Sequence, residues 1–316
     1  MLALFIILAA LQESDGNYAD VRRIMVEATV DVDYQPEFPA LDNGHNTTVL
    51  IDRYHDTIYR IDGIASGTST LLEILAADGF QTAYLDQAIS AERLAESDVL
   101  FIHGLPNEEV QLPNGGTFWR SPLAAGEIDS VVRWVDGGGG LFLSLSHFPN
   151  GSGALPLLEA FSVRFRDGYI YSDSYPSFTD PVNGHCSHYF GLSSQDHTLN
   201  TDHPLLQDGL PVSRVDLHCG AGVFREAEDV VLGFPAGSIN YDATGQISET
   251  SDFYAGMIAF NYGAGRVVIA TDQGLFRDFI FEFDSGDQVF VTITGPENDN
   301  ANLFVNTVRW LSPNLR

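Results

Sequence analysis

The chain of 316 residues is 44% hydrophobic and 18% charged, which is typical of a globular protein with a full core and not of a disordered one. Its 43 acidic residues face only 15 basic ones, all of them arginine, for a formal net charge of -28. Such a surface repels the phosphates of nucleic acids and of anionic lipids, so we expect neither as a partner.

The acidic surface without lysine predicts a protein adapted to high salt, a halophilic protein. Salt shortens the range of charge interactions to about 3 Å at 1 M, which removes the self-repulsion that otherwise loosens an acidic fold. We therefore expect the melting temperature to rise between low and molar NaCl. The alternative is an acidic exported protein from a genome in which arginine codons replace lysine codons.

The first residues predict export. Residues 1–11 form an apolar run that is too short to span a bilayer, and the polar segment 12–16 follows at once. We expect residues 1–16 to be a signal peptide or an N-terminal anchor, and the protein to be secreted, periplasmic or held in the cell envelope. No later segment is long and apolar enough to predict a membrane span.

The sequence contains two cysteines, Cys186 and Cys219. In an exported protein such a pair most often forms a disulfide. His185 and His188 flank the first and His218 precedes the second, and Cys with His suits zinc or copper. A disulfide, free buried thiols and a metal site therefore all stay open.

The predicted elements begin with a strand at 24–32, where apolar and polar residues alternate, and a linker at 35–46. Residues 17–46 thus form an N-terminal strand and linker. From residue 47 on, strand and helix patterns alternate. Strands are predicted at 48–51, 82–85, 99–102 and 141–145, with helices around 71–75, at 91–95 and from 121 to the glycine run 137–140. This order predicts βαβ units, so we expect residues 47–316 to form one α/β domain around a doubly wound, mostly parallel, flavodoxin-like sheet.

The helix before the glycine run has the clearest signals. Ser121 offers an N-cap, Pro122 suits the first helical position, and apolar residues then recur at helical spacing. The strand at 141–145 is apolar on both faces, as in a central parallel strand covered by helices.

The second half of the chain has a different pattern. Strands are predicted at 215–223, 230–234, 257–260 and 267–270, and a tight turn at 263–265 joins the last two. We therefore expect an antiparallel extension of the sheet in the C-terminal half. A final amphipathic helix is predicted at 301–311.

Polar residues that follow the predicted strands are the candidate site residues, because doubly wound sheets bind ligands beyond the carboxyl ends of their strands. These residues are Asp52 and His55 after the first strand, His103 after the third, Ser146 and His147 after the fourth, and Asp272 after the strand at 267–270.

Three roles are open to these side chains. Serine, histidine and aspartate can form a nucleophilic triad, although the segment around Ser146 lacks the glycines of a nucleophile elbow. The histidines with Asp52 or Asp272 can instead bind a divalent metal that activates water, although no helical histidine motif supports it. The same side chains can also simply hydrogen-bond and hold the strand ends in shape.

Several segments in this order carry a family resemblance. They are 49–52 with His55, 75–80, 139–149, 161–165, 203–206, 263–268, and 306–311 with Asn300. Over residues 47–170 and 199–312 the chain resembles a branch of secreted proteins of unknown function in the class I glutamine amidotransferase-like superfamily, related at fold level to trehalose-utilisation-type proteins. The resemblance implies a flavodoxin-like fold and directs attention to Asp52, His55 and His147. The amidotransferase cysteine is absent from the turn after 141–145, so glutamine hydrolysis is not expected.

Two functions follow from these patterns. The first is a hydrolase that acts on an extracellular small molecule or glycan at the predicted rim. The second is a non-catalytic ligand-binding or envelope-interaction module that uses the same rim for a small-molecule or carbohydrate ligand. The sequence identifies no cofactor and no metal.

Overall fold

The computed structural model describes residues 24–26, 47–55, 69–147, 151–166, 168–175, 190–218, 220–242, 246–250, 255–282, 288–295 and 297–315. The predicted signal or anchor segment at 1–16 and nearly all of the strand and linker at 17–46 lie outside these residues. So do His185, Cys186, His188 and Cys219. None of the described helices has the length and apolarity of a membrane span.

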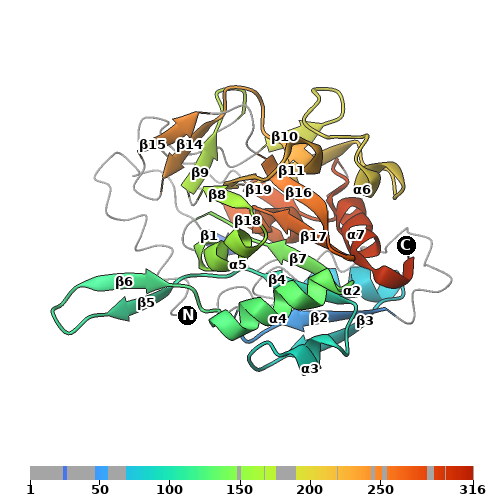
Figure 1. The fold of residues 1–316 in the computed structure, drawn as a ribbon. Coiled ribbons are helices and arrows are strands. Elements are labelled where there is room, and N and C mark those ends of the chain that lie inside the picture. Colours follow the sequence, from blue (N-terminus) through green and yellow to red (C-terminus); the bar gives the residue numbers. More distant parts are fainter. Residues whose placement is uncertain are drawn as a thin grey trace.

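The core is a mixed sheet of nine strands (Figure 1) in the order β3-β2-β4-β7-β17-β16-β12-β8, with β13 paired to β16. The first five strands are parallel, and β16, β12, β8 and β13 each run antiparallel to their neighbours. The parallel sheet with an antiparallel extension in the C-terminal half is therefore confirmed. The strands are β2 (Thr48–Asp52), β3 (Gln81–Leu85), β4 (Val99–His103), β7 (Gly140–Ser144), β8 (Arg164–Arg166), β12 (Gly222–Phe224), β13 (Val230–Gly233), β16 (Ala255–Tyr262) and β17 (Gly265–Ala270).

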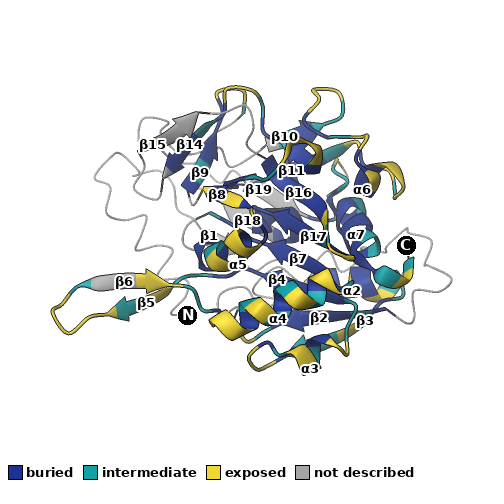
Figure 2. Ribbon diagram, viewed as in Figure 1, coloured by how far each residue is buried: buried dark blue, intermediate teal, exposed yellow. Residues whose placement is uncertain are grey.

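Helices cover both faces of this sheet, as its doubly apolar strands predict. One face packs against α2 (Ser69–Ala77) and α7 (Asn300–Leu311), and we call it the α7 face. The opposite face, the α4 face, packs against α3 (Ala91–Leu94), α4 (Ala125–Asp136) and α5 (Leu155–Ala160). The central strands are buried throughout, whereas α4 exposes its outer side (Figure 2). Successive strand residues point to opposite faces, so each strand contributes to both cores.

Smaller sheets and short helices surround this core. The three-stranded sheets are β1 (Ile24–Val26), β18 (Asp278–Glu282) and β19 (Gln288–Thr292), and β9 (Gly168–Tyr171), β14 (Ile239–Asp242) and β15 (Ile247–Thr250). The two-stranded sheets are β10 (Phe190–Ser193) with β11 (Arg214–Leu217), and β5 (Glu108–Gln111) with β6 (Thr117–Arg120). The short helices are α6 (Pro204–Gln207) and the 3-10 helices η3 (Ser152–Ala154), η5 (Ala227–Asp229), η6 (Gln273–Phe276) and η7 (Pro313–Leu315).

Two predicted boundaries are wrong. The helix α4 begins at Ala125 and not after Ser121, because Glu127 Oε2 accepts the backbone N–H of Ala124 at 2.8 Å and so caps the helix there. Ser121 instead accepts from Leu123 N at 3.1 Å within the preceding turn. The single strand predicted at 215–223 is two strands, β11 and β12, which pair in different sheets. The predicted final helix is confirmed as α7.

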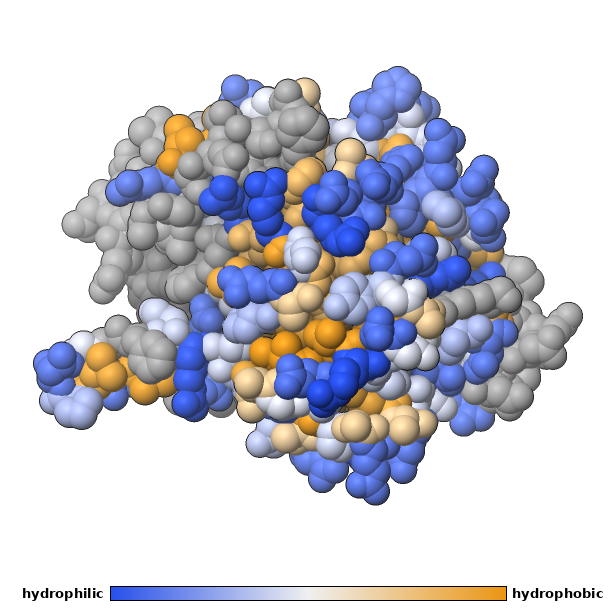
Figure 3. All heavy atoms as spheres, in the orientation of Figure 1, coloured by the Kyte–Doolittle hydropathy of each residue, from blue (hydrophilic) through white to orange (hydrophobic). Residues whose placement is uncertain are grey.

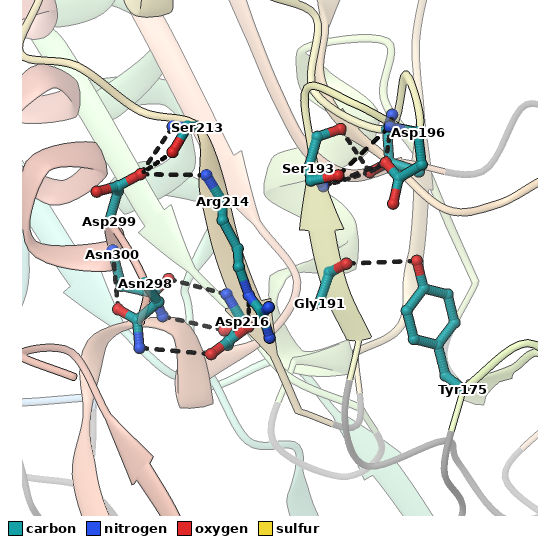
Figure 4. A network of polar contacts seen from close by, with 11 residues as sticks. Tyr175, Gly191, Ser193, Asp196, Ser213, Arg214, Asp216, Asn298, Asp299 and Asn300 are labelled. Atoms are coloured by element: carbon teal, nitrogen blue, oxygen red, sulfur yellow. Dashed lines mark hydrogen bonds and ion pairs between the residues drawn. The ribbon is translucent and has the colours of Figure 1, made fainter. Parts of the chain in front are cut away.

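The N-terminus of α7 is fixed to β11 by a polar network (Figure 4). Asp299 Oδ2 accepts from the backbone nitrogen of Ser213 at 2.7 Å and from that of Arg214 at 3.1 Å. Asn300 Oδ1 accepts from Asp216 N at 2.9 Å, and its Nδ2 donates to Asp216 O at 3.0 Å. The buried end of α7 therefore lies against the sheet with its polar groups paired, as buried polar groups require.

The sequence patterns did not predict the β5–β6 hairpin, which reaches away from the body of the fold (Figure 1). Trp119 of this hairpin is 47% exposed to solvent. On the face of the molecule drawn in Figure 3, apolar residues gather toward the middle and hydrophilic residues dominate the periphery.

Candidate functional site

The order of the parallel strands places the expected ligand crevice between β2 and β4. The chain passes from β2 outward to β3 and then returns to the other side of β2 to form β4, so strand order reverses there. Ligands of doubly wound sheets bind at such a switch point. The carboxyl ends of β2 and β4 carry Asp52 and His103, two of the predicted site residues.

These two side chains lie on opposite faces of the sheet. Asp52 comes two residues after Leu50, which belongs to the α4-face core, so the two side chains lie on the same face. Asp52 contacts His55, whose ring in turn reaches Glu127 of α4. His103 comes two residues after Phe101, which belongs to the α7-face core, and the centroids of the two rings lie 5.6 Å apart. The single rim expected from the sequence is therefore divided by the sheet into two groups.

The first group consists of Asp52, His55 and Glu127. Asp52 Oδ1 accepts from the backbone nitrogens of Tyr54 at 2.9 Å and His55 at 3.2 Å, which folds the chain back just after β2. Asp52 Oδ2 then lies 2.7 Å from His55 Nδ1. The other ring nitrogen, His55 Nε2, lies 3.1 Å from Glu127 Oε1, at ion-pair distance although without hydrogen-bond alignment.

The two carboxylates control the protonation of His55. Burial alone would lower the pKa of the imidazole, but the hydrogen bond and charge of Asp52, together with Glu127, raise it above its usual value. The imidazolium form, which bridges two carboxylates inside the protein, therefore persists to a higher pH than that of an ordinary histidine. The stability that this bridge contributes is full below pH 6.5 and is lost as the pH rises through the elevated pKa.

Glu127 is a functional candidate that the sequence patterns missed. Its Oε1 accepts from Ile89 N at 2.7 Å, and its Oε2 accepts from Ala124 N. One carboxylate thus joins β2, the segment before α3 and the start of α4. Glu127 is the third residue after the helix N-cap, a position at which glutamate commonly caps a helix. Because the helix was predicted to begin at Ser121, Glu127 was not recognised as this residue.

The second group lies on the α7 face around His103. His103 and Ser144 are register partners at the ends of β4 and β7, and Ser144 is in turn paired with Ala270 at the end of β17. The His103 nitrogens and Ser144 Oγ are all buried without a hydrogen-bond partner. Burial, assisted by the charge of Arg277, lowers the pKa of His103 to about 3, so its imidazole is neutral.

Asp272 follows β17 next to this group. Its Oδ1 accepts from Gly274 N at 2.8 Å, and its Oδ2 accepts from the backbone nitrogen of His218. Burial raises the pKa of Asp272 to about 7, against the lowering effect of those two donors and of Arg277. The adjacent Gln273 is buried, and neither its amide oxygen nor its amide nitrogen has a partner.

The pKa of Asp272 predicts a pH-dependent stability. The native carboxyl holds its proton to about pH 7, whereas the unfolded one releases it near its usual value of 3.8, so this contribution is full below pH 3.8 and is lost as the pH rises to about 7. In the natural protein this contribution to the free energy of unfolding falls by at most about 1.4 kcal/mol per pH unit. We expect the Asp272→Asn variant not to show this fall, because asparagine does not titrate. Urea unfolding of both proteins from pH 4 to 8 measures it. Parallel pH profiles would contradict the prediction.

The predicted residues Ser146 and His147 lie just beyond the carboxyl end of β7. Ser146 is buried, and its carbonyl oxygen lies so close to Gly151 that a Cβ at residue 151 would approach it to 2.2 Å. Residue 151 must therefore be glycine for the backbone to pass this close to Ser146. The half-buried His147 packs against the ring of Tyr169 in β9 at 4.6 Å.

The described residues give no support to a metal centre. Among them, no group of three or more His, Cys, Asp or Glu side chains is arranged to hold a metal ion. The backbone nitrogen of His218 is used by Asp272, while its predicted partners at 185, 186, 188 and 219 lie outside the described residues.

Comparison with known proteins supports the fold. No protein-family model and no curated protein matches the sequence. Among solved structures, the mmIFT52 N-terminal domain matches with a TM-score of 0.52 and 14% identity, over 84% of this chain and 97% of that one. A ThuA-like protein from Bacteroides uniformis has a TM-score of 0.47 and 14% identity, over 89% and 100%. A GMP synthase protein from Thermoplasma acidophilum has a TM-score of 0.38 and 12% identity, over 84% and 93%.

The chain shares the α/β fold of the mmIFT52 N-terminal domain. An α/β fold with a parallel core and antiparallel C-terminal strands is what the sequence predicted. Identities this low speak to architecture alone, and the activity has to be argued from the site.

Proposed function

We propose that this protein is a non-catalytic ligand-binding module on an amidotransferase-like fold. The observation that carries the proposal is the environment of His55, whose two ring nitrogens both face carboxylates at 2.7 and 3.1 Å. Its side chain is 1% exposed. A general base must bring a ring nitrogen within hydrogen-bond reach of the proton that it removes, whereas each nitrogen of His55 lies against a carboxylate of the protein.

The hydrolase alternative has the right residue types but lacks their connections. Ser144, His103 and Asp272 all belong to strand ends or turns at the same edge of the sheet. In a nucleophilic triad, however, serine bonds to the imidazole and the imidazole bonds to the carboxylate. Here both nitrogens of His103 and Ser144 Oγ have no hydrogen-bond partner, and Asp272 accepts from backbone nitrogens.

The candidate ligand is a small molecule or carbohydrate, and the export signal predicted at residues 1–16 would bring the protein to it outside the cytoplasm. The acidic surface supports an uncharged ligand over an anionic one, since a net charge of -28 repels anions.

The test is an activity screen paired with a binding screen. Purified protein is incubated with chromogenic ester, amide and glycoside substrates, and in parallel with neutral sugars and polyols observed by saturation-transfer NMR. We expect binding of at least one neutral compound and no turnover above that of the Ser144→Ala variant. Turnover by the natural sequence that is lost in Ser144→Ala or in His55→Asn would overturn the proposal.

A further inference from the structure

Three buried polar side chains without hydrogen-bond partners lie at or just beyond the carboxyl ends of β4, β7 and β17. His103 is 1% exposed, Ser144 is fully enclosed and Gln273 is 2% exposed. Five of their atoms lack a hydrogen-bond partner, namely Nδ1 and Nε2 of His103, Oγ of Ser144, and Oε1 and Nε2 of Gln273. We call these three residues the orphan cluster.

The strand register puts the first two members side by side. His103 and Ser144 are register partners in adjacent parallel strands, so their side chains emerge on the same face. Two residues earlier in each strand, Phe101 and Phe142 stack at 4.7 Å, which identifies that face as the α7 face. Ala270, the next partner along this row, adds only a methyl group beside Ser144.

The third member belongs to η6, which packs on the α7 face through its last two residues. Gln273 begins this short helix, and Phe276 at its other end packs against Phe142 at 5.4 Å. Asn300 of α7 holds η6 in place by donating to Leu275 O at 3.0 Å. Arg277, which follows η6, acts electrostatically on both His103 and Asp272.

Burying several polar groups without hydrogen-bond partners destabilises the folded state. Each buried polar group without a partner costs about 1–3 kcal/mol, and native proteins keep few of them. Isolated examples do occur here, at Thr47 before β2 and at Asn240 in β14. Three such residues around one strand row indicate that something else supplies the partners.

We propose that the orphan cluster is a binding site for the hydroxyl groups of a small uncharged molecule, a polyol or the end of a sugar. This inference rests on the proposed binding function and specifies its site and ligand class. A neutral imidazole, a hydroxyl and a carboxamide each carry both a donor and an acceptor. A hydroxyl also donates and accepts, so a ligand with two or three hydroxyls can pair with all three side chains.

The charges nearby favour the same class of ligand. Arg277 and the ionised form of Asp272 have opposite signs and influence each other, so they offset one another beside the cluster. An anionic ligand would meet Asp272, and a cationic one would meet Arg277. An uncharged ligand avoids both penalties.

The experiment uses glycerol, erythritol and glucose as probes, with acetate as a charged comparison. Saturation-transfer NMR and the shift in melting temperature report binding to the natural sequence and to the variants Ser144→Ala and Gln273→Leu. Asn240→Leu is the matched control, because it also removes a buried, unpaired polar side chain but lies in a different sheet.

We expect at least one hydroxyl probe to bind, acetate not to bind, and each cluster variant to weaken binding by about tenfold or more, the equivalent of one lost hydrogen bond to an enclosed group. The unliganded variants should melt no lower than the natural protein, since an unpaired polar group has been removed. Asn240→Leu should leave the affinity unchanged.

The failures of the two proposals differ. If no hydroxyl probe binds and Ser144→Ala only raises the melting temperature, the cluster holds water and the inference is overturned. If a probe binds equally well to all variants, the binding function stands but its site lies elsewhere. If a probe is chemically consumed and Ser144→Ala stops it, the site stands and the non-catalytic function is wrong.

Discussion

Replacing Glu127 with alanine is expected to destabilise the protein by about 3–5 kcal/mol. The change leaves the backbone nitrogens of Ile89 and Ala124 without the acceptors that now lie at 2.7 and 2.8 Å. It also leaves the positive charge on His55 with one carboxylate in place of two. Chemical denaturation with urea, followed by circular dichroism at pH 6, measures the loss.

The matched control is Glu127→Gln, which keeps one carbonyl oxygen in the same place and removes the charge. It should cost clearly less than alanine, about 1–2 kcal/mol, since one of the two backbone donors keeps an acceptor. If Glu127→Ala costs no more than about 0.5 kcal/mol, as an ordinary surface substitution does, then the carboxylate does not join β2 to α4.

Replacing Arg309 with methionine is expected to cost about 3 kcal/mol. Arg309 lies on α7 and contacts both carboxylate oxygens of Asp78, one of them at 2.9 Å from Nε. The Asp78 side chain is completely enclosed, so the variant leaves a buried carboxylate without its cation. Burial already raises the pKa of Asp78 in spite of Arg309, and without the arginine the pKa rises further. The loss of stability should therefore be larger at pH 8 than at pH 5, where the carboxyl can accept a proton.

Two further variants make this prediction specific. The double variant Asp78→Leu with Arg309→Met removes both charges and should recover most of the loss, because the cost comes from the unpaired carboxylate. Arg120→Met breaks an exposed pair with Glu108 at 2.7 Å and should cost less than about 1 kcal/mol. Equal losses for Arg309→Met and Arg120→Met would contradict the role assigned to the buried pair.

The predicted site illustrates the limits of sequence patterns. Asp52, His55, His103 and Asp272 were predicted because each follows a strand pattern, and the structure places all four at or just beyond strand ends. The candidates Glu127, Ser144 and Gln273 were not predicted. The spacing of apolar residues in α4 assigns Glu127 to the exposed side of the helix, so it was not considered. Ser144 is the last residue of an otherwise apolar strand, so it was counted with the core.

The sequence by itself determined the sheet and its layers. A strand that is apolar on both faces can bury its surface only between two helical layers, and 141–145 met that condition; the alternation of 48–51, 82–85 and 99–102 with helices predicted the parallel order. The turn at Gly79, with φ of 89°, and the turn at Gly263, with φ of 57°, were equally readable, because glycine adopts such angles without strain.

Only the tertiary structure decided which polar groups face one another. Successive side chains of a strand point to opposite faces of the sheet. The face on which the last side chain lies therefore depends on the residue at which the strand ends. Asp52 ends β2 on the α4 face and is linked to Glu127 through His55, while His103 ends β4 on the α7 face beside Ser144. A shift of one residue in where either strand stops would exchange these partners, and local sequence preferences do not fix strand ends to one residue.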